Sequence, residues 1–204
     1  MARNRGPRLK IVRRFGQHLP GLTRKSAENR PYPPGQHGMA RRSKPSDYRV
    51  RLEEKQKLRF NYGLSERQLR KYFRQASSTK GDTGQNLLST LESRLDNVVF
   101  RAGYAPTIPS ARQLVAHGHI LINGRRCDVP SYIVREQDTL SLKEKTRKNV
   151  MVADCFAAPT LEVPSYLSRD EGKLESTFTA RPTREDVPLE IQEHLVIEHY
   201  SRVA

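Results

Sequence analysis

The segment ARQLVAHGHILINGRR (residues 111–126) places two histidines, His117 and His119, on either side of one glycine. Two imidazoles at this spacing could be metal ligands, a catalytic pair, or polar side chains beside a chain reversal. A zinc site needs three or four ligands in fixed geometry, and only Asp128 and Cys127 lie close enough in sequence to join the histidines. We therefore expect no metal, and favour either a contact between His119 and Asp128 or side chains that face RNA.

Enzyme signatures are absent from the sequence. The chain contains no GxxxxGK[ST], GxGxxG, HExxH or GxSxG motif. Paired acids such as Glu53 and Glu54 belong to a polar helical pattern, where solvation is the usual interpretation. We expect no catalytic residue and no cofactor, which indicates a binding protein.

The two histidines lie where a predicted helix gives way to a predicted hairpin. Thr107 is a suitable N-cap for that helix, Pro109 fits its first turn, and Gly118 can end it in the left-handed conformation. The inward-facing side of the helix would carry Ala111, Leu114 and Val115.

The hairpin is predicted from a two-residue turn. Strands are predicted at residues 119–122 and 125–129. They are joined by Asn123-Gly124, which is the strongest short hairpin signal, and Ile122 and Arg125 should pair across this turn. A further strand is expected at residues 139–142. This part of the chain is therefore predicted to be a helix-helix-hairpin unit with a small antiparallel sheet.

The charge of the chain points to a polyanion. The 204 residues carry a net charge of +15 and an isoelectric point of about 10.2, with only 35% hydrophobic residues. Residues 1–50 hold thirteen Lys or Arg against two acids, whereas residues 151–204 hold five against ten. We expect the N-terminal half to bind the polyanion and the C-terminal segment to face protein or solvent.

The N-terminal 45 residues read as a basic arm that orders on its partner. Arginines come first, followed by the Pro/Gly-rich segment RPYPPGQHG, in which Tyr32 and His37 could stack on bases. A flexible linker is the alternative.

Helices are predicted in the next segments. Residues 46–63 form one, and Ser65 and Gln68 form a capping box that opens a second, with one apolar and one basic face. A third would run from Gly84 to Gly103 with its leucines and valines inward, and a C-terminal helix is expected at residues 189–202. The predicted core residues of the second and C-terminal helices are Leu69, Tyr72, Phe73, Ala76, Leu189, Ile191, Leu195, Val196 and Tyr200.

Cysteine use and hydropathy favour a reducing compartment and no membrane segment. Cys127 and Cys155 form no CxxC motif, and no stretch approaches the roughly 20 apolar residues needed to span a bilayer. The start of the sequence lacks the apolar core of a signal peptide.

The segment LESRLDNVVFRAGYAPTIPSARQLVAHGHILINGRRCDVPSYIV (residues 91–134) resembles the RNA-binding domain of the bacterial and plastid small-subunit ribosomal protein S4 family. RPYPPGQHG in the arm, RLEEKQKLRFNYGLSERQLRKYF in the helical region and HLVIEHYS near the end are similar to the same family. The helix-hairpin unit also occurs in pseudouridine synthases, a heat-shock protein and some tyrosyl-tRNA synthetases, but four such motifs in this order are specific. Nearly the whole chain is covered, least clearly residues 145–182.

The resemblance implies an α+β protein with an RNA-binding domain inserted into a helical domain. The expected boundaries are a basic, disordered-like arm at residues 1–45, a helical domain at 46–93 completed by 160–204, and an S4-type RNA-binding domain at 94–157. Some relatives bind zinc through cysteines in the arm, but here no cysteine precedes Cys127, so a zinc-free form is expected. Many relatives have arginine at the position of Ile108; Arg112, Arg125 or Arg126 would replace that RNA contact.

The function implied by the resemblance is that of a structural constituent of the ribosome. Such a protein binds small-subunit (16S) rRNA at a multi-helix junction of the 5′ domain, nucleates assembly of the subunit body and contributes to translational accuracy. The implied partners are ribosomal protein S5, S12 in accuracy, and messenger RNA where it enters the subunit. The implied location is the ribosome of a bacterial cytoplasm or of the plastid stroma.

Candidate RNA-binding residues combine cations for phosphate with side chains that stack or hydrogen-bond. They are Arg3, Arg5, Arg8, Arg13, Arg14, Tyr32, His37, Arg67, Arg70, Lys71, Arg74, Arg94, Arg101, Arg112, Gln113, His117, His119, Arg125 and Arg126. For Arg94 and Arg101, solvation or pairing with Asp96 is the alternative. The alternatives for the whole chain are an RNA-modifying enzyme with this module, a messenger-binding repressor, or a DNA-binding helix-turn-helix protein.

Overall fold

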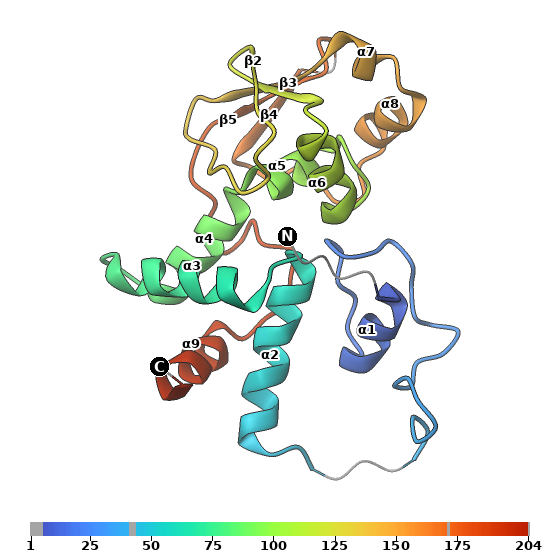
Figure 1. Ribbon diagram of the computed structural model, residues 1–204, viewed down its shortest axis with the longest axis vertical. Coiled ribbons are helices and arrows are strands. Elements are labelled where there is room, and N and C mark those ends of the chain that lie inside the picture. Colours follow the sequence, from blue (N-terminus) through green and yellow to red (C-terminus); the bar gives the residue numbers. More distant parts are fainter. Residues whose placement is uncertain (1–5, 41–43, 171, 204) are drawn as a thin grey trace.

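The computed structural model describes residues 6–40, 44–170 and 172–203. They form a helical unit and a sheet unit, and the sheet unit lies above the helical unit in Figure 1. The helical unit contains α2 (Asp47–Asn61), α3 (Glu66–Ser78), α4 (Thr83–Glu92) and α9 (Glu193–Val203). The sheet unit contains α5 (Leu95–Arg101), α6 (Ile108–Ala116), β1 (Ile120–Ile122), β2 (Arg125–Arg126), β3 (Thr139–Leu142), α7 (Glu144–Arg147), α8 (Val150–Ala157), β4 (Leu167–Asp170) and β5 (Glu175–Phe178). A further helix, α1 (Arg8–Phe15), precedes both.

Helices of the helical unit begin at side-chain caps that the sequence specifies. Ser46 and Asp82 accept main-chain hydrogen bonds at the starts of α2 and α4, and Ser65 with Gln68 forms the predicted capping box of α3. The predicted stripe of α3 points inward as expected, with Leu69, Tyr72 and Ala76 buried and Phe73 partly buried.

The C-terminal helix is shorter than predicted, because α9 begins at Glu193 and not at residue 189. Leu189 and Ile191 are buried while Glu190 and Gln192 are exposed, and this period of two is that of an extended segment. The predicted core residues still lie inside: Val196 and Tyr200 are buried, and Leu195 is half-buried.

The single helix predicted between Gly84 and Gly103 is two helices, α4 and α5, separated at Ser93 and Arg94. The chain leaves the helix there because its main chain pairs with a distant loop. The amide of Val134 donates to the carbonyl of Ser93, and the amide of Leu95 donates to the carbonyl of Tyr132, both at 2.8 Å. Periodicity could not reveal this break, since the apolar residues on both sides are buried as predicted.

The antiparallel sheet has the strand order β2-β1-β3-β5-β4. The turn of its hairpin is as predicted: Ile122 pairs with Arg125, and Asn123 and Gly124 adopt positive φ angles of 48° and 76°. The return strand is shorter than predicted, because β2 ends at Arg126 and not at residue 129. The strand β3 also has the predicted bounds.

Two strands of this sheet were not predicted. β4 and β5 are short and partly polar, yet β5 pairs with β3 through Thr139 with Thr177 and Leu140 with Ser176. The sheet unit therefore extends past residue 157, and this part of residues 160–204 does not complete the helical domain as expected.

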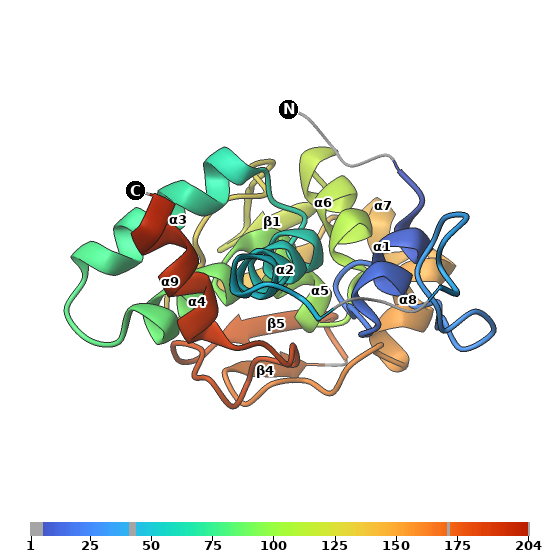
Figure 2. The ribbon, with the colours of Figure 1, turned by 90° about the horizontal axis from the view of Figure 1, so that it is seen from below.

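The N-terminal arm differs most from its prediction. It contains α1, and Val12, Leu19 and Leu22 are buried in the common core. Its composition suggested a segment without a core, but these few apolar residues are spaced so that all three point inward. Figure 2 shows α1 on the side of the molecule opposite α3 and α9.

Among the helices of the described residues, none is long and apolar enough to cross a membrane.

Candidate nucleic-acid interface

A groove of about 960 Å³ runs between the arm, the connection from α2 to α3, and the start of α6. Its charged lining residues are Arg8, Lys10, Arg14, Arg59, Glu66 and Arg112, five cations and one acid. Residues from three distant parts of the sequence therefore form one basic concave surface. We call it the basic groove.

The single acid does not offset the cations of the groove. Glu66 accepts hydrogen bonds from the ammonium of Lys55 at 3.0 Å and from the hydroxyl of Tyr200 at 2.9 Å. Burial raises the pKa of Glu66, but these two hydrogen bonds and the charge of Lys55 outweigh it and lower the pKa. Glu66 is thus ionised and paired at neutral pH, and the groove stays positive.

Two helices begin at this groove. Ser65, the N-cap of α3, lines it, as do Ile108 and Pro109 at the start of α6. The N-terminus of a helix carries a partial positive charge that favours anions. The helix ends thus add to the field of the side chains.

Arg112 lies at the groove and is oriented by a buried carboxylate. Its Nη1 atom is 3.5 Å from Oδ2 of Asp96, and the Arg112 side chain is only 12% exposed. Asp96 also binds Arg94 through two hydrogen bonds, of 2.6 and 3.1 Å. The ion pairs of Asp96 with Arg94 and Arg112 therefore set the orientation of the Arg112 side chain at the groove. The neighbouring Gln113 is exposed.

The fold buries Arg94 and Arg101, two of the predicted RNA-binding residues. Arg94 is fully buried between Asp96 and the hydroxyl of Tyr72, which explains its place at the break between α4 and α5. Arg101 is 5% exposed and donates a 2.9 Å hydrogen bond to the carbonyl of Asp186. Both guanidinium groups are held inside the protein, and Arg94 makes the pairing with Asp96 that was the alternative.

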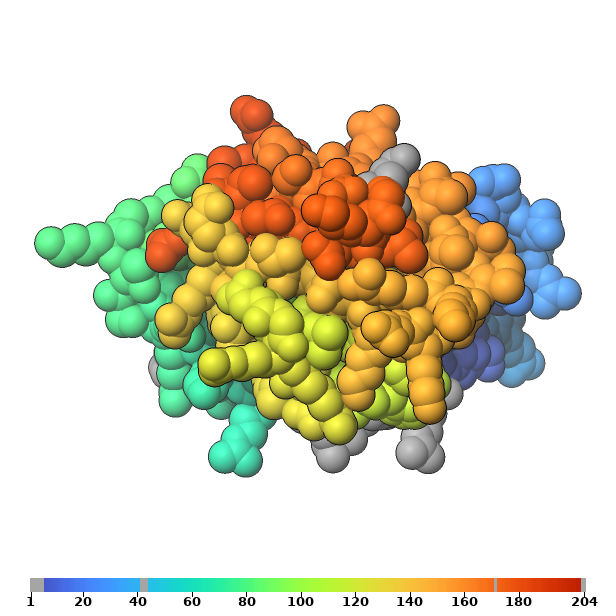
Figure 3. Space-filling model, turned by 90° about the horizontal axis from the view of Figure 1, so that it is seen from above, coloured from blue at the N-terminus to red at the C-terminus, as the bar shows by residue number. Residues whose placement is uncertain are grey.

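The hairpin places its arginines in solvent. Arg125 and Arg126 are both exposed. The Arg126 guanidinium lies over Gly118, where a Cβ atom would approach its Nε within 2.2 Å. Figure 3 shows the hairpin, in yellow-green, at the surface of the upper face of the molecule.

One of the two alternatives for the histidines, the contact between His119 and Asp128, does not form. His119 is half-buried and its Nδ1 lies 2.9 Å from the hydroxyl of Thr146, not against Asp128. Asp128 instead accepts a hydrogen bond from Arg126 at 3.4 Å. His117 is exposed, and Gly118 has the predicted left-handed conformation with φ at 70°. No group of three or more metal-ligating side chains occurs within the part of the chain that the structure describes.

The basic face of α3 is oriented as predicted. All four of its cations are exposed: Arg67, Arg70, Lys71 and Arg74.

The predicted residues of the arm lie in four different settings. Arg3 and Arg5 lie outside the described residues, Arg8 and Arg14 line the basic groove, and His37 is exposed.

Arg13 and Tyr32 instead contact each other within the chain. Arg13 Nε donates to the carbonyl oxygens of Arg30 and Tyr32 at 3.1 and 3.0 Å, and its guanidinium lies 4.9 Å from the Tyr32 ring centre. This contact folds the Pro/Gly-rich segment against α1, so both side chains have a structural role that the sequence did not indicate.

Two cations of the groove were not among the predicted RNA-binding residues. Lys10 lies within the basic run of the arm, so its charge was visible in the sequence. Arg59 lies near the end of α2, with its guanidinium 4.4 Å from the Phe60 ring centre. Only the tertiary contact between α2 and the arm reveals Arg59.

Comparison with known proteins shows similarity along the whole chain. The family described as ribosomal protein S4/S9 N-terminal domain matches residues 3–92, and the S4 domain matches residues 93–140. The small ribosomal subunit protein uS4 of Synechococcus sp. (strain CC9902) is 56% identical over 203 residues, which is 99% of each chain. The uS4 proteins of Thermosynechococcus vestitus and a Picosynechococcus species are 56% and 55% identical, over 99% and 100% of both chains.

Proposed function

This chain belongs to the family of small ribosomal subunit protein uS4, and we propose that its basic groove, the cations of α3 and the hairpin bind small-subunit rRNA as one surface. As a uS4 protein, the chain is a structural constituent of the ribosome that binds rRNA, and it is not an enzyme. The relatives do not support the alternative of an RNA-modifying enzyme or a messenger-binding repressor.

The observation that carries the proposal is the charge of the groove. Its five cations come from the arm, α2 and α6, and its one acid is paired with Lys55. A concave surface with one sign of charge concentrates the field and attracts the phosphates of a folded RNA. RNA helices are recognised mainly through shape and backbone, which suits a surface built from three segments.

The proposed RNA contacts are the predicted residues that the fold leaves accessible, together with Lys10 and Arg59. They are Arg8, Lys10, Arg14, His37, Arg59, Arg67, Arg70, Lys71, Arg74, Arg112, Gln113, His117, His119, Arg125 and Arg126.

We further propose that the target is the multi-helix junction of the 5′ domain, and that binding there nucleates assembly of the subunit body and contributes to translational accuracy. Ribosomal protein S5 is the proposed protein partner, with S12 involved in accuracy, and messenger RNA would pass nearby. The acidic balance of residues 151–204 supports a protein contact at that end of the chain. The proposed location is the ribosome of a bacterial cytoplasm or of the plastid stroma.

The experiment is competition binding with the full chain at moderate salt. Folded 5′ domain of small-subunit rRNA competes against duplex DNA of equal length and against a messenger leader. We expect a preference of at least a hundredfold for the rRNA, because only a folded junction fits the whole surface. Equal binding to all three competitors would contradict the proposal.

A further inference from the structure

A buried carboxylate lies at the point where the helical unit meets the sheet unit. Glu92 is the last residue of α4 and is 1% exposed. It also ends the first of the two matched family regions, since the second begins at residue 93. We propose that Glu92 is a positioning residue, whose carboxylate fixes the two units relative to each other and thereby the shape of the basic groove.

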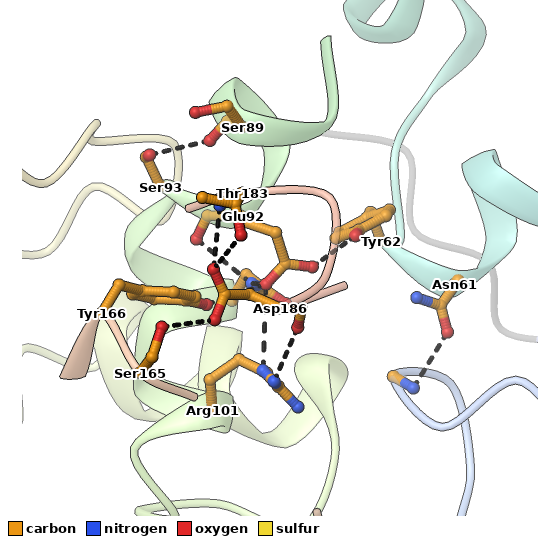
Figure 4. Close-up of polar contacts among 12 residues, drawn as sticks. Asn61, Tyr62, Ser89, Glu92, Ser93, Arg101, Ser165, Tyr166, Thr183 and Asp186 are labelled. Atoms are coloured by element: carbon orange, nitrogen blue, oxygen red, sulfur yellow. Dashed lines mark hydrogen bonds and ion pairs between the residues drawn. The ribbon is translucent and has the colours of Figure 1, made fainter. Parts of the chain in front are cut away.

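The carboxylate receives hydrogen bonds from both units (Figure 4). From the helical unit, the hydroxyl of Tyr62, the C-cap of α2, donates to Oε1. From the sheet unit, Oε2 accepts from Tyr166 at 2.9 Å and from the side-chain amide of Asn97 at 2.6 Å. The two oxygens of one carboxylate therefore bind different units.

The hydrogen bonds from Tyr62, Tyr166 and Asn97 offset the cost of burying the Glu92 carboxylate. Burial of an ionised carboxylate away from solvent lowers the stability of the fold unless the carboxylate is hydrogen-bonded and paired with a cation. Arg101 supplies the opposite charge, with its Nε 3.9 Å from Oε2 of Glu92. Burial and the Glu92 charge raise the pKa of Tyr62 and of Tyr166, so both hydroxyls remain protonated donors.

The same cluster also binds the segment between β5 and α9, through which the chain passes from the sheet unit back to the helical unit. Arg101 donates to the carbonyl of Asp186, and the Asp186 carboxylate accepts from the hydroxyls of Ser165 and Thr183, both at 2.8 Å. Figure 4 shows these residues around Glu92, although they are far apart in the sequence. Both crossings between the units are thus tied to one cluster.

The cluster reaches the groove on two sides. Tyr62 itself lines the basic groove, next to Gly63 and Leu64. Asn97 and Arg101 belong to α5, which packs on α6, and α6 supplies Arg112 to the opposite side. Loss of the bond between Tyr62 and Glu92 would loosen the coupling between these two sides.

The test compares two buried tyrosines in the full chain. Tyr62→Phe removes a hydroxyl that joins the units. Tyr104→Phe is the matched control, because the Tyr104 hydroxyl is also buried but bonds Leu174 and Ser176 within the sheet unit. Both variants should lose some stability, since each loses a buried hydroxyl together with its hydrogen bonds.

The readout is the distance between spin labels at Ser77→Cys on α3 and Lys145→Cys on α7, with Cys127→Ser and Cys155→Ser, measured by pulsed electron resonance. We expect Tyr62→Phe to broaden the distance distribution at least twofold and to weaken binding of 5′-domain rRNA about three- to tenfold. Tyr104→Phe should do neither.

Equal distributions for Tyr62→Phe and the parent chain, or equal broadening by Tyr104→Phe, would overturn the proposal. Broadening without weaker RNA binding would overturn the link to the groove. The RNA readout rests on the proposed function, but the distance measurement needs no RNA. A chain that fails to bind rRNA would therefore count against the proposed function alone.

Discussion

The main-chain amide of Gly21 donates a 2.9 Å hydrogen bond to the side-chain oxygen of Asn61, the last residue of α2. The carbonyl of Gly21 in turn accepts from the amide of Ile108, the first residue of α6, also at 2.9 Å. One residue of the arm thus connects the end of a helix in the helical unit with the start of a helix in the sheet unit. The arm is part of the folded structure.

Gly21→Ala should therefore destabilise the protein. A Cβ atom at this position would lie 2.6 Å from the carbonyl oxygen of Asn61 and 2.6 Å from Cδ1 of Ile108. Such overpacking costs about 1–3 kcal/mol. Urea denaturation would measure the loss. Gly172→Ala is the control, because there the nearest atom is 3.5 Å away, and its stability should change little. Similar values for both variants would show that residue 21 does not lie in a packed core.

Removal of Arg94 should affect stability and not the electrostatic part of RNA binding. Arg94→Met leaves the buried Asp96 carboxylate with the longer ionic contact to Arg112 and the main-chain amide of Asn97, and breaking a buried ion pair costs about 3–5 kcal/mol. The double variant Arg94→Met with Asp96→Asn should recover part of that loss, because position 96 then carries no buried charge. The salt dependence of rRNA binding should be unchanged in molecules that remain folded. A reduced salt slope would mean that Arg94 reaches RNA.

The hairpin arginines should behave in the opposite way. Arg125→Ala with Arg126→Ala should reduce the slope of log K against log salt by up to about two, because each exposed guanidinium that neutralises a phosphate contributes about one. Thermal unfolding should be nearly unaffected. Arg181→Ala with Lys173→Ala removes two exposed cations that do not line the groove, and this control should keep the slope of the parent chain. The same slope in all three proteins would remove the hairpin from the interface.

Acid should weaken the packing of α9 through His199. Burial lowers the pKa of His199, and the positive charges of Lys55 and Arg51 lower it further. The unfolded chain, with a histidine pKa of about 6.5, thus binds a proton more readily than the folded protein. Stability is therefore fully present above that pH and is lost as the pH falls through the folded-state pKa.

The pH effect can be assigned by substitution. Urea denaturation at pH 7, 6 and 5 should show a smaller decline for His199→Gln than for the parent chain. His37→Gln, at an exposed position, should decline like the parent chain. A decline that persists in full in His199→Gln would place the responsible group elsewhere.

Local features of the fold were predictable because local residues determine them. The capping box of Ser65 and Gln68, the turn at Asn123-Gly124 and the left-handed Gly118 depend on residues that are neighbours in sequence. The break at Arg94 and the strands β4 and β5 depend on pairing with distant segments, so their short sequences carried little signal.

The site was predictable in charge but not in geometry. The sequence shows that Arg94, Arg101 and Arg112 are cations. Only the fold reveals that Arg94 binds Asp96 and that Arg101 donates to the carbonyl of Asp186. Arg59 and Lys10 join the groove only because the arm packs on α2. A buried arginine and an exposed one have the same letter in the sequence, and burial depends on long-range contacts.

The central claim is that rRNA occupies the basic groove and the cationic face of α3. Acetylation of lysines in the free and RNA-bound protein, read by mass spectrometry, tests it directly with the unaltered chain. Lys10 lies in the groove, Lys71 on α3, and Lys173 in the connection between β4 and β5, and all three are exposed. We predict at least fivefold protection of Lys10 and Lys71 by 5′-domain rRNA and none of Lys173; protection of Lys173 with Lys10 and Lys71 still reactive would contradict the claim.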